Sequence, residues 1–580
     1  MAQVPGTRTE ANSSPAGRRP RRGLELGGLV IGIVAGLSIA LGWLISPRGH
    51  PSGPVVTSTH RPVLVGGSSG SSAEPDPAAL DAEWAAYSDH SSCADWAGGD
   101  GVSAIRLNSS QLAWFFSDTY LGPAGPGIGF SHLSGFVHNS VVVQTTTGPG
   151  STFVTLTGGG ACTSPDGPGD AAPVVGARPA GSDVPPDRYW EEDGIKTGGT
   201  VVKFYNHYLA GSVPFVPAGT VIATFPVSQL SSAGRMHQYG AVARPDLVPL
   251  PSYTPPAGGS PILWGAALLR AGNTVYIYGT RSPNVQVPDG RLFLARVPVS
   301  QLTAFSAWRF YTGAGTWTAG QQNARPVQPP GSALTVSSGF SVVQVGRRYW
   351  LIQAGTVAGG PDIDAYPAST PWGPFDFAAG RLLYRDPTIG LDAAHDFRIM
   401  YEARAEPALS TRHTLVISYN VNSEAVTIGC VPMSAFTNTV TLPRFIAVPL
   451  AAFGDDAGAY VNSAVSGAPD YPRIVSRDPS QWFDAWDYPD GCPPVPGLVS
   501  VQARPGAGKV TLSWPDAGLG VRYRVYLQGP GEPGDTPVAT AYTDGTTLSG
   551  LRPGDYQAKV VPVNFKKNTG PAAEVTFTVP

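Results

Sequence analysis

Two five-residue segments of the chain are identical, and a third is similar to them. Pro226-Val-Ser-Gln-Leu230 and Pro298-Val-Ser-Gln-Leu302 start 72 residues apart, and Pro432-Met-Ser-Ala-Phe436 starts 134 residues after the second. Midway between the last two, where a missing copy would fall, lies Ser369-Thr-Pro-Trp-Gly-Pro-Phe375. A repeat of roughly 70 residues made of short strands and turns is typical of sheets stacked radially as propeller blades. Because the inner strands of such a ring converge on one axis, we expect the functional residues to lie there.

The predicted strands fall into five groups within residues 90–450. The groups cover residues 103–156, 199–225, 263–311, 340–384 and 398–448. With 72 Gly, 58 Pro and 14% charged residues, the composition is that of a turn-rich all-β protein. We therefore predict an all-β fold whose main part is a five-bladed β-propeller at 90–450. A pair of β-sandwiches is the structural alternative, but it gives no reason for the period of about 70 residues.

An uncharged apolar run, Leu26 to Ile45, follows the basic segment Arg18-Arg-Pro-Arg-Arg22. At about 1.5 Å per residue this run spans a hydrocarbon core of ~30 Å. The alternative is a cleaved signal peptide, although the run is long for one and lacks an Ala-x-Ala-like exit. Positive charge on its N-terminal side predicts an inside N-terminus and an exported body. We predict a cytoplasmic N-terminus at 1–25, a transmembrane anchor at 26–45 and a flexible stalk at 46–80. The protein would lie at the cell membrane as a single-pass protein with extracellular C-terminal domains.

The cysteines agree with export. All four lie in the part predicted to be outside: Cys93, Cys162, Cys430 and Cys492. An even number without a CxxC pair indicates up to two disulfide bonds, and three pairings remain open.

We expect no cofactor and no nucleic-acid partner. The net charge is −3, and the only basic cluster belongs to the predicted anchor. No phosphate loop, dinucleotide fingerprint or Gly-x-Ser-x-Gly elbow is present. A structural calcium ion could bind the acids of Asp392-Ala-Ala-His-Asp396 or Asp166-Gly-Pro-Gly-Asp170, although neither matches an EF-hand loop. The oligomeric state is left open.

The sequence pattern changes after Cys492. Residues 451–494 form a closing segment and linker, and the strands predicted at 495–580 alternate as sandwich strands do. This last segment resembles a fibronectin type III domain: Trp514 resembles its core Trp, and Leu551-Arg-Pro-Gly-Asp-Tyr556 resembles its tyrosine corner. The resemblance implies a spacer or adhesion module.

Acidic residues recur at the start of the predicted inner strands and on the adjoining hairpins. These acids are Asp95, Asp100 and Asp118 in the first group, Glu191, Glu192 and Asp193 in the second, and Glu402 and Glu406 in the fifth. Cleavage of a glycosidic bond needs two carboxyl groups, one to donate a proton and one to act as base or nucleophile. The alternative is that each acid only caps a turn through its own backbone.

Several motifs follow one another along the predicted propeller: Trp114-Phe-Phe-Ser-Asp-Thr-Tyr-Leu-Gly122, Asn139-Ser-Val-Val-Val-Gln144, Trp264-Gly-Ala-Ala267 with Tyr278-Gly-Thr-Arg281, Ser369–Phe375 and Ser418-Tyr-Asn-Val-Asn422. Together they resemble the five-bladed propeller glycoside-hydrolase-like proteins of bacteria, and within these an uncharacterised group related to secreted D-arabinan-cleaving enzymes. The resemblance covers about residues 93–450. It implies a pocket for a furanoside or another glycan, with Asp100, Asp118 and Asp193 as the matching acids.

The fifth group departs from that family. Relatives tend to carry a His-Pro-Glu-like step before Ser-Tyr-Asn-Val-Asn, where this chain has Glu406-Pro407-Ala408. Either the carboxylate has moved to Glu406, or the site binds glycan without cutting it.

Two functions follow. The first is a membrane-anchored, outward-facing glycoside hydrolase acting on an envelope or extracellular polysaccharide, arabinan-like furanosides included. Asp100 or Asp118 would be the base or nucleophile, and Glu192, Asp193 or Glu406 the proton donor. Carboxyl groups roughly 5.5 Å apart would indicate retention of configuration, and roughly 6.5–9.5 Å inversion. The second is a non-catalytic surface protein that binds glycan or protein.

Six further residues are candidates for substrate binding: Asn139, Trp264, Arg281, Arg404, Tyr419 and Asn420. An Arg guanidinium can hold a carboxylate or sugar hydroxyls, and an ordinary salt bridge is the alternative. Trp264, Trp190 or Trp372 could stack on sugar rings, and packing inside the blades is the alternative.

Overall fold

The computed structural model describes residues 75–454 and 495–580 with gaps, and two short strands at 64–65 and 474–476. The gaps are 91, 93, 125–134, 148–149, 160–170, 177–186, 210–215, 235–240, 254–259, 282–289, 331, 333, 338, 355–359, 393–396, 424–440, 496, 516–521, 542–544 and 564–567. The four cysteines, the apolar run 26–45 and the segment 432–436 lie outside the described residues. Among the helices within those ranges, none is long and apolar enough to cross a membrane.

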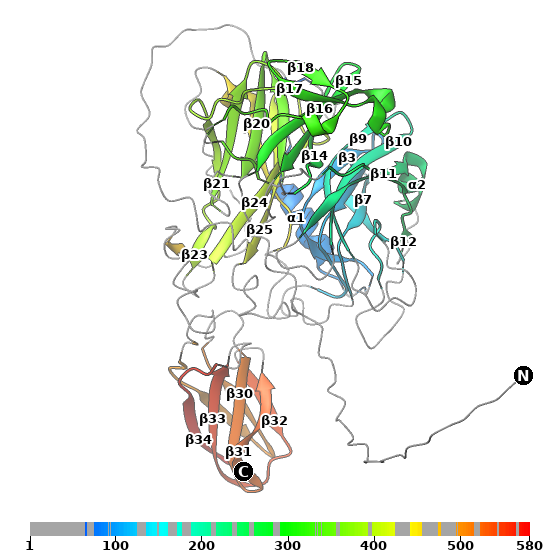
Figure 1. Ribbon diagram of the computed structural model, residues 1–580. Helices are drawn as coiled ribbons and strands as arrows, with labels where there is room; N and C mark the ends of the chain where they lie inside the picture. Colours follow the sequence, from blue (N-terminus) through cyan, green and yellow to red (C-terminus); the bar gives the residue numbers. More distant parts are fainter. Residues whose placement is uncertain are drawn as a thin grey trace, which may run out of the picture.

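Five sheets follow one another along the main body of the chain, coloured from blue to yellow in Figure 1. The first contains β3 (Ser103–Arg106), β4 (Gln111–Phe116), β7 (Ser140–Thr147), β8 (Gly150–Thr157) and β12 (Ala241–Val242). The second contains β9 (Arg188–Thr197), β10 (Thr200–Tyr208), β11 (Pro217–Pro226) and β13 (Asp246–Pro249). The third contains β14 (Leu263–Ala271), β15 (Thr274–Arg281), β16 (Arg291–Pro298), β17 (Arg309–Gly313) and β18 (Thr316–Thr318).

The last two sheets each take in a strand that is distant in the chain. The fourth contains β1 (Leu64–Val65), β19 (Phe340–Val345), β20 (Arg348–Ala354), β21 (Asp362–Ala368) and β22 (Arg381–Arg385). The fifth contains β23 (Gly390–Asp392), β24 (Phe397–Ala405), β25 (Thr414–Ser423), β26 (Arg444–Pro449) and β27 (Ile474–Ser476). A small sheet of β2 (Trp96–Gly99), β5 (Thr119–Leu121) and β6 (Gly135–Val137) adjoins the first.

The sheets pack as a ring. The first strands meet in turn, since β3 contacts β9, β9 contacts β14, β14 contacts β19 and β19 contacts β24. An aromatic pair crosses each junction between neighbouring sheets, including the one between the fifth sheet and the first. These pairs are Phe115–Phe225, Phe204–Trp308, Tyr278–Phe340, Trp350–Phe453 and Trp114–Phe445, with ring centroids 5.3 to 6.5 Å apart. The main body therefore has an all-β, propeller-like fold.

The repeated pentapeptide ends the third strand of a sheet. Pro226 ends β11 and Pro298 ends β16, and each is followed by a short helical segment, α2 (Val227–Ala233) or η1 (Val299–Gln301). The backbone N–H after each Pro donates to the turn between the first two strands, from Val227 to Gly199 O (2.8 Å) and from Val299 to Asn273 O (2.9 Å). In these two copies the motif therefore marks the edge after the third strand.

An equivalent of the motif that the sequence comparison did not find begins at Pro449. Pro449 ends β26, η6 (Leu450–Phe453) follows, and Leu450 N donates to His413 O at 2.8 Å. The residue four positions after each Pro is buried: Leu230, Leu302 and Phe453. The segments that begin at Pro226, Pro298 and Pro449 share only the Pro and the buried apolar residue four positions later. Because 432–436 is more similar to the pentapeptide in sequence, it was identified in place of 449–453. The remaining short helices are η2 (Phe305–Ala307) and η3 (Gln321–Asn323).

A helix that the sequence did not predict, α1 (Pro77–Ser88), lies at the junction of the fifth and first sheets. Asp76 caps it by accepting from Ala78 N and Ala79 N, and Pro77 suits its first turn. Trp84 is 1% exposed and packs edge-on against Trp96 and Trp114. The helix starts inside the predicted stalk because distant aromatic residues stabilise it, and no local pattern reveals that contact.

The C-terminal residues form a second unit of two sheets, coloured orange and red in Figure 1. One sheet contains β28 (Gln502–Gly506), β29 (Lys509–Ser513) and β32 (Gly545–Ser549); the other contains β30 (Arg522–Gly529), β31 (Glu532–Ala541), β33 (Gly554–Val563) and β34 (Ala573–Val579). Trp514 and Tyr523 lie in the core between them. Tyr556 Oη contacts the backbone O of Pro530 and of Arg552, at 3.2 and 3.0 Å.

The buried Leu of the repeated motif is expected to stabilise the ring. Leu230 is fully buried, whereas Leu247 on β13 is 45% exposed. Replacing a buried Leu by Ala removes apolar contacts and leaves a cavity, so Leu230→Ala should lower the free energy of unfolding by about 2–5 kcal/mol. Leu247→Ala should change it by less than about 1 kcal/mol. Chemical denaturation of both variants checks this, and equal effects would contradict the structural role of the motif.

Candidate active site

The backbones of two acidic residues are paired where the small sheet meets the first. Asp100 follows β2, and Asp118 lies between β4 and β5. Asp100 N donates to Asp118 O (3.1 Å), and Ser117 N donates to Asp100 O (2.7 Å). Gly101 makes this pairing possible, because it has φ +63° and a Cβ there would come within 2.3 Å of Ser117 Oγ. The Asp-Gly step and the Ser-Asp-Thr turn of the sequence therefore hold two acids at one point.

Asp118 accepts two hydrogen bonds on one oxygen. His138 Nδ1 lies 2.8 Å from Asp118 Oδ1, and Trp190 Nε1 donates to the same atom at 2.9 Å. The side chain of Asp118 is 14% exposed and that of His138 15%. Donors from two other segments thus fix the orientation of a carboxylate that still reaches solvent.

Asp100 is in a different environment. Tyr401 Oη, from β24 of the fifth sheet, donates to Asp100 Oδ2 at 2.8 Å. Burial raises the pKa of Asp100 well above its usual range, and the carboxylates of Asp118 and Glu402 raise it further. Both effects favour the protonated form of Asp100.

A buried ion network lies beneath this pair. Lys203 on β10 forms an ion pair with Glu191 Oε2, and Arg404 on β24 reaches Glu191 Oε1 (3.3 Å) and Glu192 Oε2 (3.0 Å). Ser103 Oγ on β3 donates to Glu191 at 2.9 Å. All four charged side chains of this network are buried. Burial raises the pKa of Glu192 to about 8, although Arg404 opposes the shift.

Two of the predicted catalytic acids link neighbouring sheets. Asp193 accepts from Gly194 N and, at 2.6 Å, from Leu268 N on β14. Glu406 accepts from Ala104 N on β3 (2.8 Å) and from Ser418 Oγ on β25 (2.6 Å), and burial raises its pKa to about 8. Both oxygens of Glu406 and one oxygen of Asp193 are therefore engaged in joining strands.

Of the six predicted binding residues, the structure brings Arg404 and Asn420 to the carboxyl groups. Asn420 Nδ2 donates to Glu402 Oε2 at 3.4 Å. Asn139 is buried and bonds to the backbone of Val175 and Tyr189. Tyr419 Oη donates to Asp386 at 2.9 Å.

Trp264 and Arg281 lie in the third sheet. Trp264 is 1% exposed and packs against Trp308 and Phe310. Its ring therefore belongs to the core of the third sheet and is not available to stack on a sugar. The guanidinium of Arg281 lies 4.8 Å from the ring centroid of Phe293, and burial lowers its pKa.

The sequence analysis did not name His138 and Lys203, and it named Glu402 among the acids of the fifth group but not as a catalytic or binding residue. Lys203 carries a sequence signal, because it is one charged residue in the strand Val201-Val-Lys-Phe-Tyr205. His138 directly precedes the Asn139 motif, but only folding brings it to Asp118. No cluster of three His, Cys, Asp or Glu suited to a metal ion occurs among the described residues. The acids named for calcium, apart from the backbone of Asp392, lie outside them.

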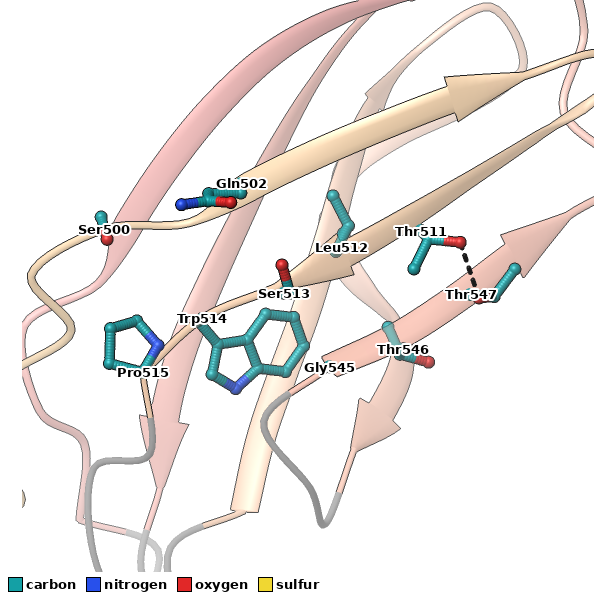
Figure 2. A pocket seen from close by; sticks show the side chains of 10 residues that line it. All are labelled: Ser500, Gln502, Thr511, Leu512, Ser513, Trp514, Pro515, Gly545, Thr546 and Thr547. Atoms are coloured by element: carbon teal, nitrogen blue, oxygen red, sulfur yellow. Dashed lines mark hydrogen bonds between the residues drawn. The ribbon is translucent and has the colours of Figure 1, made fainter.

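A groove of about 580 Å³ lies in the C-terminal unit, away from these acids (Figure 2). Five of its ten lining residues carry hydroxyl groups, beside Gln502 and Trp514, and Thr511 on β29 is hydrogen-bonded to Thr547 on β32 at 3.0 Å. No carboxyl group is among these lining residues.

One protein family matches residues 81–453, which is most of the chain and the whole ring from within α1 to η6. The chain belongs to the DUF5005 family. The description of this family is "domain of unknown function". No curated protein matches the chain in sequence.

Solved structures resemble the chain only weakly. A Bacteroides ovatus protein provisionally described as a hydrolase has 18% identity and a TM-score of 0.48, covering 65% of this chain and 92% of its own. A GH43_1 enzyme from Xanthomonas citri, solved with xylose, has 13% identity and a TM-score of 0.34, covering 68% and 100%. An α-L-arabinanase from Cellvibrio cellulosa has 10% identity and a TM-score of 0.32, covering 63% and 99%. Likenesses this weak transfer no function to the DUF5005 chain.

Removing the cation of the buried network should be costly. Lys203→Met leaves Glu191 without its nearest counterion, so the free energy of unfolding should fall by about 3–5 kcal/mol. Chemical denaturation of this variant and the wild type measures the loss.

Two further variants control this prediction. Lys509→Met, at an exposed position on β29, should change stability by less than about 0.5 kcal/mol. Adding Glu191→Gln to Lys203→Met should restore part of the loss. A double variant no more stable than Lys203→Met would contradict the pairing.

Proposed function

We propose that the chain is a glycoside hydrolase in which Asp118 and Asp100 act as the base or nucleophile and the proton donor. The observation that carries this proposal is the contrast between two adjacent, partly exposed acids. Asp118 accepts two N–H donors, whereas burial and neighbouring carboxylates raise the pKa of Asp100 and so favour its protonated form. Glycosidic cleavage requires this division, with one carboxyl group as acid and one as carboxylate.

Each neighbouring group has a role in this mechanism. Asp100 transfers its proton to the oxygen of the leaving sugar, and the Tyr401 hydroxyl then stabilises the carboxylate that remains. Asp118 either removes a proton from the attacking water or bonds to the anomeric carbon, while His138 and Trp190 hold it in place. The buried network of Glu191, Glu192, Lys203 and Arg404 supports the pair.

The proposed substrate is an extracellular or envelope polysaccharide, and arabinan-like furanosides are the first class to test. The motif resemblance supports this choice, as does the partly exposed Trp190 beside Asp118, which offers an aromatic ring next to the reacting bond. We further propose that the ring is a five-bladed propeller, held outside the membrane by an anchor at 26–45. A fibronectin type III-like unit at 495–580 would act as a spacer.

A second candidate is a surface protein that binds glycan without cutting it. The step Glu406-Pro407-Ala408 favours this reading. Both carboxyl oxygens of Glu406 already join strands, and Ala408 is buried in the packing of the fifth sheet against the first. The fifth sheet therefore supplies no free carboxyl group at this step.

Incubation of the purified full-length chain with arabinans and other envelope glycans separates the two functions. We expect release of oligosaccharides, and a rate roughly 10²–10⁴-fold lower for Asp118→Asn and Asp100→Asn. Activity should fall as pH rises through the elevated pKa of Asp100, because the proton donor is then lost. Chromatography of the products measures the release of oligosaccharides, the lower rates of the two variants and the dependence of activity on pH.

Asp535→Asn, at an exposed position of the C-terminal unit, is the matched control and should keep full activity. Glycan binding without release, unchanged in the two site variants, would contradict the hydrolase proposal and favour the second candidate.

A further inference from the structure

Glu402 has a left-handed backbone conformation within a strand. Among the described non-glycine residues, only Ala314 and Glu402 have positive φ, at +47° and +52°. Ala314 lies in the tight turn between β17 and β18, where such a conformation is ordinary. Glu402 lies inside β24, and the register of β24 against β25 shifts between Tyr401 and Arg404. A strained residue of this kind persists only where the surrounding structure imposes it.

The surroundings of Glu402 show what imposes this conformation. Asn420 on β25 donates to Glu402 Oε2 at 3.4 Å. On the other side, Gly339, directly before β19, approaches so closely that a Cβ there would lie 2.7 Å from Glu402 Cγ and 2.9 Å from its Cβ. Any larger residue at 339 would have to displace the Glu402 side chain.

The side chain that is held in this way faces the groups of the proposed site. Its charge raises the pKa values of Asp100, Tyr401, Glu192 and Tyr208, and that of Arg404. These groups come from the turn after β2 and from β24, β9 and β10. Glu402 therefore contributes to the electrostatics of all three carboxyl-bearing segments.

We propose that Glu402 is a third carboxylate of the site, presented to Asp100 and Glu192 by the left-handed turn of β24. Gly339 is the positioning residue that leaves room for it. The consequence for cleavage rests on the function proposed above. The repulsion between Glu402 and its two neighbours favours the protonated form of each of them.

The pH dependence of thermal unfolding tests this without any substrate. An acid whose pKa is raised by folding binds a proton more tightly in the folded chain than in the unfolded one. It therefore costs stability as pH rises from about 4 toward the raised value. Replacing Glu402 by Gln removes the repulsion and reduces that cost. The difference in Tm between Glu402→Gln and the wild type should thus be more positive at pH 8 than at pH 5, by roughly 1–2 °C.

A purely structural role for Glu402 predicts something else. Loss of its bond to Asn420 would change Tm by the same amount at both pH values, and this outcome would overturn the proposal. Glu574→Gln, on the exposed surface of the C-terminal unit, is the matched control and should show no such pH dependence.

Gly339→Ala tests the positioning role. It should displace the carboxylate and reproduce the pH dependence of Glu402→Gln. Gly199→Ala, where an added Cβ meets nothing within 4 Å, should leave the pH dependence unchanged. A Gly339→Ala variant with the wild-type pH dependence would overturn the role of Gly339.

Activity distinguishes this inference from the proposed function. If the chain cleaves glycan, Glu402→Gln should lower the pH at which activity is lost on the alkaline side. If no glycan is cleaved while the Tm differences hold, the hydrolase proposal fails and the role of Glu402 stands. If glycan is cleaved with an unshifted alkaline limit, the role of Glu402 fails and the hydrolase stands.

Discussion

The pairing of Glu191 and Glu192 with Lys203 and Arg404 is the interaction on which the rest of the ring depends. Placing acids at the centre of a protein costs free energy, because each charge loses its hydration. Two buried cations from β10 and β24 offset that cost, and Ser103 on β3 adds a hydrogen bond to Glu191. The same contacts join the first, second and fifth sheets. The same ion pairs therefore neutralise the buried acids and hold the three sheets together.

The centre of the ring is organised in two layers. The deeper layer consists of the buried ion network and of Asp193 and Glu406, which hydrogen-bond to neighbouring strands. Most polar atoms of this layer are bonded to other protein groups. The outer layer consists of Asp100, Asp118, His138, Trp190 and Glu402, which are partly exposed. A fixed lower layer limits the movement of the groups above it, which is what acid–base chemistry requires of its carboxyl groups.

The sequence predicted the features that depend on local patterns. The pentapeptide is a local pattern, since Pro ends a strand and a buried Leu follows four residues later, and two copies lie where expected. The acids of the first, second and fifth groups were recognised from their places beside predicted strands. Long-range contacts were not predictable in this way. Helix α1 is stabilised by contacts with Trp96 and Trp114. His138 becomes a site residue only because folding brings it to Asp118. The left-handed conformation of Glu402 requires the space that Gly339 leaves. Trp264 could not be assigned either, because stacking on a sugar and packing in a sheet need the same residue type.

The site joins parts of the chain that are very far apart in sequence. Tyr401 meets Asp100 across 301 positions, and Glu406 meets Ala104 across 302. Contacts of such range form late, because the intervening chain must first be ordered. A polypeptide that is still being synthesised holds Asp100 and Asp118 long before it holds Tyr401, Glu402 and Arg404. The carboxyl groups of Asp100 and Asp118 therefore acquire their final surroundings only when the fifth sheet has packed against the first.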